Sequence, residues 1–163
     1  MINNIENLLE IAIQEAEAAI ERNDEPYGAV IADKEGNIIS SSGNMENTTF
    51  NIVGHAEILA IQKACRKLHK KDLKGLIMVT NYKPCCMCAS AILMSGIEHV
   101  YVGSNFQGFD ELFLEAVTKI KSHGYEFKQE GIAHERCFKQ VTRGRKKLQG
   151  IEGYSSSHLN GIL

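Results

Sequence analysis

The sequence predicts an α/β fold in which a sheet is covered by helices. Two observations support this class: short apolar runs typical of strands alternate with stretches of helical periodicity, and the chain has no internal repeat. The 163 residues, of which 44% are hydrophobic and 23% charged, suit a single folded domain with a substantial core. We expect that domain to occupy residues 1–149 and a flexible tail to occupy residues 150–163.

The first half of the chain is expected to hold a helix, a hairpin and a second helix. Apolar residues recur at helical spacing from Ile5 to Ile20 and predict an amphipathic helix. Two strands, Gly28–Ala32 and Asn37–Ser40, flank a short turn and predict the hairpin. A polar loop follows over Ser41–Asn51, and helical spacing returns over His55–Leu68.

The second half continues the alternation of strand and helix. Pro84 suits the first position of a helix, because the amide hydrogen that proline lacks would be unpaired there, and Gly96 suits the end of that helix. The predicted elements are strands at Leu76–Thr80 and Ile97–Val102, and helices at Cys85–Met94, Glu111–Ile120 and about Ala133–Lys147.

Charge and apolar patterning exclude some classes of protein. A formal net charge of -2 argues against a uniformly basic nucleic-acid binder, although a local basic patch is compatible with it. No apolar run is long enough to span a bilayer, and residues 1–10 lack the basic start and apolar block of a secretory signal. We therefore expect a cytoplasmic protein without membrane contact, in which clustered cysteines serve metal binding or catalysis instead of disulfides.

Three candidate zinc ligands stand in two short clusters, each at a predicted junction between a strand and a helix. His55 begins one helix, and Cys85 and Cys88 lie at the start of another. Residues three apart share a helix face, so both thiolates can reach one ion, and a helix start stabilises their charge. Cys86 should point elsewhere. Three protein ligands leave tetrahedral zinc one open position, which is typical of a catalytic site with one Zn²⁺ per subunit.

Glu57 is the predicted proton carrier of this site. Zinc makes a coordinated water acidic enough to attack at neutral pH, but an amino leaving group must still be protonated. Glu57 would take a proton from the attacking water, pass it to a ring nitrogen and later protonate the departing ammonia. Residues two apart diverge inside a helix, so His55 and Glu57 can converge only in its first turn.

The segments His55-Ala56-Glu57 and Pro84-Cys85-Cys86-Met87-Cys88 resemble the zinc motif of the cytidine deaminase superfamily, which reads His-x-Glu followed by Pro-Cys-x-x-Cys. The resemblance runs from about Ile11 to Lys121. It implies a three-layer α/β/α sandwich with a central mixed sheet, a zinc-dependent hydrolase, and a homodimer. It also implies substrate contacts by Asn44, by the backbone N–H of Ala56 and by Pro84.

The substrate expected from the sequence is a purine base or nucleoside. Gly108-Phe109-Asp110-Glu111 resembles a segment of the guanine deaminases of this fold. Guanine offers adjacent N–H donors that a carboxylate can accept together, which cytosine and adenine cannot match. We therefore expect conversion of guanine to xanthine, with Asp110 as the main residue that recognises the base. The alternative is that Asp110 only caps the following helix.

Three other functions stay open. Gln129–Cys137 resembles the stretch before the last helix of tRNA adenosine deaminases, and the basic run over Lys139–Lys147 could contact RNA phosphates. Residues 43–45 and 91–97 are similar to cytosine deaminases. A structural zinc with Cys86 as a fourth thiolate would instead make the chain a zinc-stabilised binding module. Lys83 stands where both the tRNA and the guanine enzymes usually carry Glu.

Overall fold

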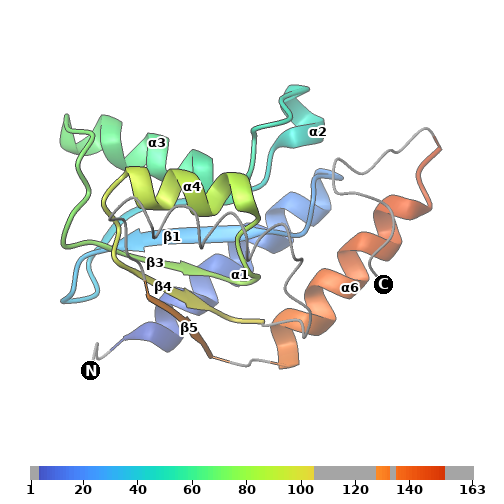
Figure 1. Ribbon diagram of the computed structural model, residues 1–163. Helices are drawn as coiled ribbons and strands as arrows, with labels where there is room; N and C mark the ends of the chain where they lie inside the picture. Colours follow the sequence, from blue (N-terminus) through green and yellow to red (C-terminus); the bar gives the residue numbers. More distant parts are fainter. Residues whose placement is uncertain (1–3, 105–127, 133–134, 153–163) are drawn as a thin grey trace.

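The computed structural model describes residues 4–104, 128–132 and 135–152. In this part of the chain the strands form one five-stranded sheet in the order β2-β1-β3-β4-β5, with helices on both faces (Figure 1). The strands are β1 (Gly28–Ala32), β2 (Ile38–Gly43), β3 (Ile77–Thr80), β4 (His99–Val102) and β5 (Lys128–Gly131). The helices are α1 (Ile5–Glu21), α2 (Glu46–Thr49), α3 (Ala56–Leu68), α4 (Cys86–Met94) and α6 (Glu135–Gln149).

The sheet is mixed, as the sequence predicts. β1 pairs antiparallel with both β2 and β3, whereas β3, β4 and β5 run parallel to one another. α3 and α4 lie side by side on one face of the sheet and α1 lies on the other, so the molecule has three layers (Figure 1). α6 packs beside α1. The predicted α/β/α sandwich is therefore confirmed.

The inner strand β1 contributes to both halves of the core. All of its residues are buried. Ala29 and Ile31 belong to the core formed with α3 and α4, whereas Val30 and Ala32 belong to the core formed with α1. A strand that is covered on both faces needs apolar residues throughout, which explains why Gly28–Ala32 is an uninterrupted apolar run.

The segment Ser41–Asn51, expected to be a polar loop, is in part regular. β2 extends to Gly43, and the short helix α2 begins at Glu46. The backbone N–H of Glu46 donates to Asn44 Oδ1 (2.9 Å), and this turn leads into the helix. Polar residues that form turns look like loop residues in a sequence, so the prediction of an unbroken loop was wrong.

β5 was not predicted. Its residues, Lys128–Gly131, contain no apolar side chain that could signal a strand, and the strand is specified by its parallel pairing with β4. Three expected features lie outside the described residues: the helix at Glu111–Ile120, the start of the last helix at Ala133, and residues 153–163 of the tail. Within the described ranges, a helix with the length and apolar character of a membrane span does not occur.

Gly28, the first residue of β1, marks a close approach of α1 to the sheet. A Cβ at this position would lie 2.0 Å from the carbonyl oxygen of Ala12 and 2.8 Å from the amide nitrogen of Ala16. Both contacts are with helix backbone, which cannot rotate out of the way as a side chain can. The spacing between α1 and β1 therefore requires glycine here.

Gly28→Ala should lower the free energy of unfolding by about 3 kcal/mol, because α1 must move away from β1 to make room for the methyl group. Gly150→Ala is the matched control. Its added Cβ would come no closer than 3.4 Å to another heavy atom, which is an ordinary contact. Its stability should stay within about 0.5 kcal/mol of the parent. Urea denaturation measures both variants, and equal midpoints would contradict the close-packing explanation.

Candidate metal centre

His55 and Cys85 occupy equivalent positions, each directly before the first residue of a helix. Both have extended backbones, with φ -68° and ψ 148° at His55 and φ -74° and ψ 173° at Cys85. The Leu59 N–H donates to the His55 carbonyl (3.0 Å), and the Ala89 N–H donates to the Cys85 carbonyl (2.8 Å). The sequence predicted both residues inside their helices, but the structure makes them N-caps. α3 therefore begins one residue later than expected, and α4 begins two residues after Pro84, its expected first position.

Three side chains of ligand type converge at the N-termini of α3 and α4. His55 Nδ1 is 3.6 Å from Cys85 Sγ and 3.4 Å from Cys88 Sγ. All three ligand atoms lie within 4.8 Å of one another. A tetrahedral zinc ion, with bonds of about 2.0–2.1 Å to nitrogen and about 2.3 Å to sulfur, holds its donors about 3.5–3.8 Å apart. The residues present therefore fit a zinc ion.

Glu57, in the first turn of α3, reaches the same point. Its Oε2 accepts a hydrogen bond from Cys88 Sγ (3.5 Å), and its side chain is buried. His55 precedes the helix, so the two side chains converge despite a spacing of two. Burial, together with the charge of Cys85, raises the pKa of Glu57 to about 7. A carboxyl group with such a pKa can both accept and donate a proton near neutrality.

The electrostatics of the cluster favour a thiolate at Cys85. The hydrogen bond from Cys88 and the neighbouring His55 lower the pKa of Cys85 to about 4, against the opposing effect of burial. The Cys88 thiol has its pKa raised by donating that hydrogen bond and by burial. Burial alone would lower the pKa of His55, but hydrogen bonds to Cys85 and Glu46 raise it to about 10. A metal cation bound to these groups would displace the protons that they share.

Cys86 does not join the cluster. It is the first residue of α4, and it packs against the apolar core beneath that helix. Among the described residues, the ligand atoms that gather around one point belong to His55, Cys85 and Cys88. Three protein donors leave tetrahedral zinc one open position, which suits catalysis better than a closed structural site.

Three of the four residues predicted to contact the substrate lie in the described part of the chain. Ala56 and Pro84 are buried and adjoin His55 and Cys85 in the chain. Asn44 is also buried, and it is connected to His55 through Glu46. Asp110, which is predicted to recognise guanine, lies outside the described residues.

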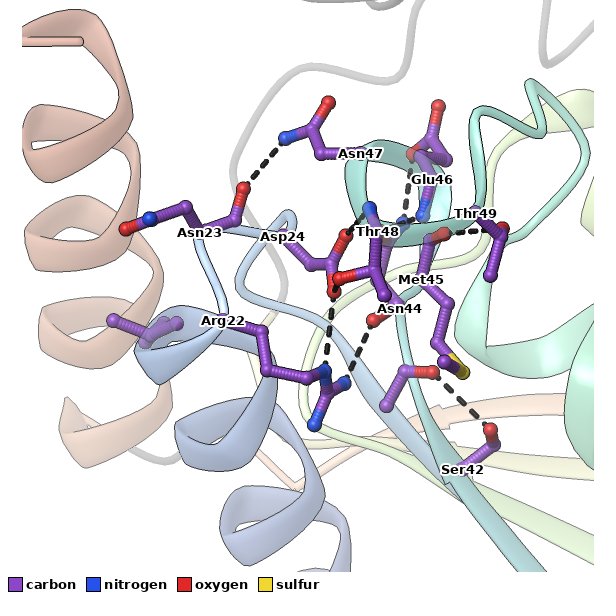
Figure 2. A network of polar contacts seen from close by, with 12 residues as sticks. Arg22, Asn23, Asp24, Ser42, Asn44, Met45, Glu46, Asn47, Thr48 and Thr49 are labelled. Atoms are coloured by element: carbon purple, nitrogen blue, oxygen red, sulfur yellow. Dashed lines mark hydrogen bonds and ion pairs between the residues drawn. The ribbon is translucent and has the colours of Figure 1, made fainter.

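Glu46 is a residue of the site that the sequence did not predict. Its Oε2 accepts a hydrogen bond from Asn44 Nδ2 (2.7 Å) and lies 3.5 Å from His55 Nε2. Figure 2 shows Glu46 at the start of α2, together with the contacts that hold this short helix. In the sequence Glu46 is a single carboxylate in a polar segment, and its spacing from His55 carries no helix or strand signal.

The basic run of α6, predicted as a possible RNA contact, is largely engaged within the chain. Lys139, Arg143, Arg145 and Lys147 bond to Glu135, Glu17, the Tyr27 hydroxyl and the Ile20 carbonyl, respectively. Two of these partners, Glu17 and the Ile20 carbonyl, belong to α1. Arg143, Arg145 and Lys147 therefore help to hold α6 in place, whereas Lys139 pairs within α6 itself. The charge pattern alone does not distinguish these roles from phosphate binding.

The fold and the donor set define a zinc-binding domain of the α/β/α type. Residues 2–104, which carry all three donors and Glu57, match the family model described as the cytidine and deoxycytidylate deaminase zinc-binding region. The match covers more than half of the chain, and the protein therefore belongs to this family. The predicted superfamily and zinc cofactor are thereby confirmed.

Relatives within the family carry two different activities in their names. The chain is 42% identical over 95 residues to the tRNA-specific adenosine deaminase of Aquifex aeolicus, covering 58% of this chain and 62% of that protein. It is 27% identical over 160 residues to the tRNA-specific adenosine deaminase of Haemophilus influenzae, covering 88% of each. It is 36% identical over 94 residues to the guanine deaminase of Bacillus subtilis, covering 55% of this chain and 60% of that protein. The first and third matches span less than two thirds of those relatives.

Solved structures of both kinds share the fold. A structure from a study of A-to-I editing by tRNA:A34 deaminases has a TM-score of 0.69 and 29% identity, covering 77% of this chain and 97% of the other. The guanine deaminase of Bacillus subtilis has a TM-score of 0.58 and 29% identity, covering 74% and 70%. The fold is therefore common to enzymes with different substrates.

Cys88→Ser should lower the zinc affinity by more than about 100-fold, because losing a thiolate that binds the ion directly costs more than losing a residue that only bonds to a ligand. Cys86→Ser, in the same helical turn, is the control and should keep one zinc ion per chain. Metal analysis and chelator competition measure both variants. Equal zinc loss in Cys86→Ser would indicate a closed site with four ligands.

Proposed function

We propose that this protein is a zinc-dependent hydrolytic deaminase that converts adenosine to inosine in a tRNA. The observation that carries the reaction class is the convergence of the buried Glu57 carboxylate on a set of three zinc donors. Three donors leave a coordination position for water, and Glu57 is placed to exchange protons beside it. A metal held only for stability needs neither feature.

The chemistry divides between the metal and Glu57. Zinc, when bound, activates a water molecule for attack near neutral pH. Glu57 would receive a proton from this water as the water oxygen adds to the carbon bearing the amino group, and would pass that proton to the adjacent ring nitrogen. Glu57 would then carry the second water proton to the amino nitrogen, so that ammonia leaves and a carbonyl group forms. One water is consumed for each ammonia released.

Similarity supports adenosine in tRNA as the substrate ahead of guanine. The match to the Haemophilus influenzae tRNA enzyme covers 88% of this chain, whereas the match to the guanine deaminase covers 55%. This order reverses the preference that Gly108–Glu111 gives in the sequence. Because four basic residues of α6 already bond to groups of this chain, we do not propose them as contacts for RNA phosphates.

Guanine is the second candidate substrate. It is supported by the resemblance of Gly108-Phe109-Asp110-Glu111 to guanine deaminases and by the 36% identity to one of them. Asp110 would accept the adjacent N–H donors of the base, and Glu57 would keep the same role. Under either substrate we propose a cytoplasmic homodimer whose deaminase domain spans residues 1–149.

An ammonia-release panel separates these candidates. The zinc-loaded protein is offered guanine, guanosine, cytosine, adenine and an adenosine-bearing tRNA anticodon stem-loop, before and after chelation. We expect turnover of the stem-loop that chelation abolishes and added zinc restores. Turnover of guanine alone, lost in Asp110→Ala, would replace the first candidate with the second. No ammonia from any substrate, with zinc bound, would favour a zinc-stabilised binding module.

Glu57→Gln should retain zinc and lower kcat by about 10²–10⁴-fold, because an amide cannot carry the proton. Glu35→Gln, at an exposed position of the β1–β2 turn, is the matched control and should keep full activity. Zinc content and ammonia release are measured together on the substrate that the panel identifies. Unchanged turnover in zinc-loaded Glu57→Gln would remove this residue from the mechanism.

A further inference from the structure

A second buried carboxylate lies next to His55, on the side of the ring opposite the two cysteines. Glu46 is 8% exposed, and its Oε2 is 3.5 Å from His55 Nε2. The other ring nitrogen of His55, Nδ1, faces Cys85 and Cys88. The imidazole therefore lies between the two thiols on one side and the Glu46 carboxylate on the other.

We propose that Glu46 is a positioning residue that orients His55 toward the metal. A neutral imidazole has one N–H and one lone pair, so an N–H donated from Nε2 to Glu46 leaves the Nδ1 lone pair for zinc. A carboxylate partner also restrains the ring and makes it a stronger ligand. The zinc affinity of the protein should therefore depend on a residue that does not touch the ion.

Tertiary contacts hold Glu46 in place, since α2 has only four residues and is too short to be stable alone. Fully buried Asp24 accepts hydrogen bonds from the Thr48 backbone N–H (2.8 Å) and hydroxyl (2.7 Å), and from Arg22 Nε (3.2 Å). Arg22 also donates to the Asn44 carbonyl (3.0 Å), as Figure 2 shows. Arg22 and Asp24, directly after α1, thus fix both ends of the segment that carries Glu46.

The same carboxylate orients Asn44. Glu46 Oε2 accepts from Asn44 Nδ2 (2.7 Å), while Asn44 Oδ1 accepts from the Glu46 backbone N–H (2.9 Å). These two bonds decide which way the amide points, so its second N–H and second lone pair are the ones that a substrate would meet. This step rests on the proposed function, in which Asn44 contacts the substrate. One oxygen then links the substrate contact to the metal ligand.

The zinc affinity of the zinc-loaded protein, measured by chelator competition, tests the role of Glu46. Glu46→Ala removes the acceptor and should weaken zinc binding by about 10–100-fold, the range typical of such partners. Glu46→Gln keeps the volume but loses the charge, and should weaken it by about 3–10-fold. Wild-type affinity in both variants would overturn the proposal. If Glu46→Ala does not fold, wild-type affinity in Glu46→Gln alone overturns it.

Thr48→Val separates orientation of His55 from stability of α2. It removes the hydroxyl bond to Asp24, while the Thr48 backbone N–H keeps its own bond to Asp24 and continues to hold the helix that carries Glu46. We expect a lower Tm, with zinc affinity within about twofold of the parent. If Thr48→Val weakens zinc binding as much as Glu46→Ala does, Glu46 acts only through the fold and the proposal fails. No substrate enters this measurement, so its outcome is independent of whether deaminase activity is found.

Discussion

The site depends on the packing of two helices with their N-termini at the same end of the sheet. α3 and α4 lie side by side over the strands (Figure 1). Ala56 and Ala60 of α3 and Ala89 of α4 are fully buried, and such small side chains let helices approach the sheet and each other closely. Helix N-termini also present backbone N–H groups and a positive dipole end, which favour thiolate charge. The metal centre is therefore a consequence of how α3 and α4 pack.

The same packing gathers acidic groups around one imidazole. Glu46, Glu57, Cys85 and Cys88 all lie next to His55 or to each other, and most of this cluster is buried. Several groups that ionise negatively in one buried place are costly unless a cation compensates them. A zinc ion supplies that charge at the centre of the cluster. The metal therefore contributes to the stability of this end of the molecule as well as to its chemistry.

In α6, tertiary packing gives basic and polar side chains partners that the sequence pattern does not indicate. Buried Gln140 donates to the Ile13 carbonyl (2.8 Å) and accepts from Asn81 (3.0 Å), which joins α6 to α1 and to the segment leading to the zinc cysteines. Arg145 lies over the rings of Tyr27 and Tyr82, 5.7 Å and 5.4 Å from their centroids. Through such contacts, part of a basic helix packs against the rest of the domain. A charge run in a sequence does not reveal the acidic and aromatic groups that fold against it.

Features that depend on neighbours along the chain can be predicted from the amino-acid sequence alone. Cys85 and Cys88 are three apart across the start of α4, and His55 and Glu57 are two apart across the start of α3. Because each pair spans about one turn, the sequence is enough to predict zinc donors and a proton carrier. The uninterrupted apolar run of β1 likewise predicts a buried strand. The contact of Glu46 with His55 and the pairing of polar β5 with β4 depend instead on the folded arrangement of segments far apart in the chain. The partners of polar groups are chosen by packing between distant segments, and no local periodicity encodes that choice.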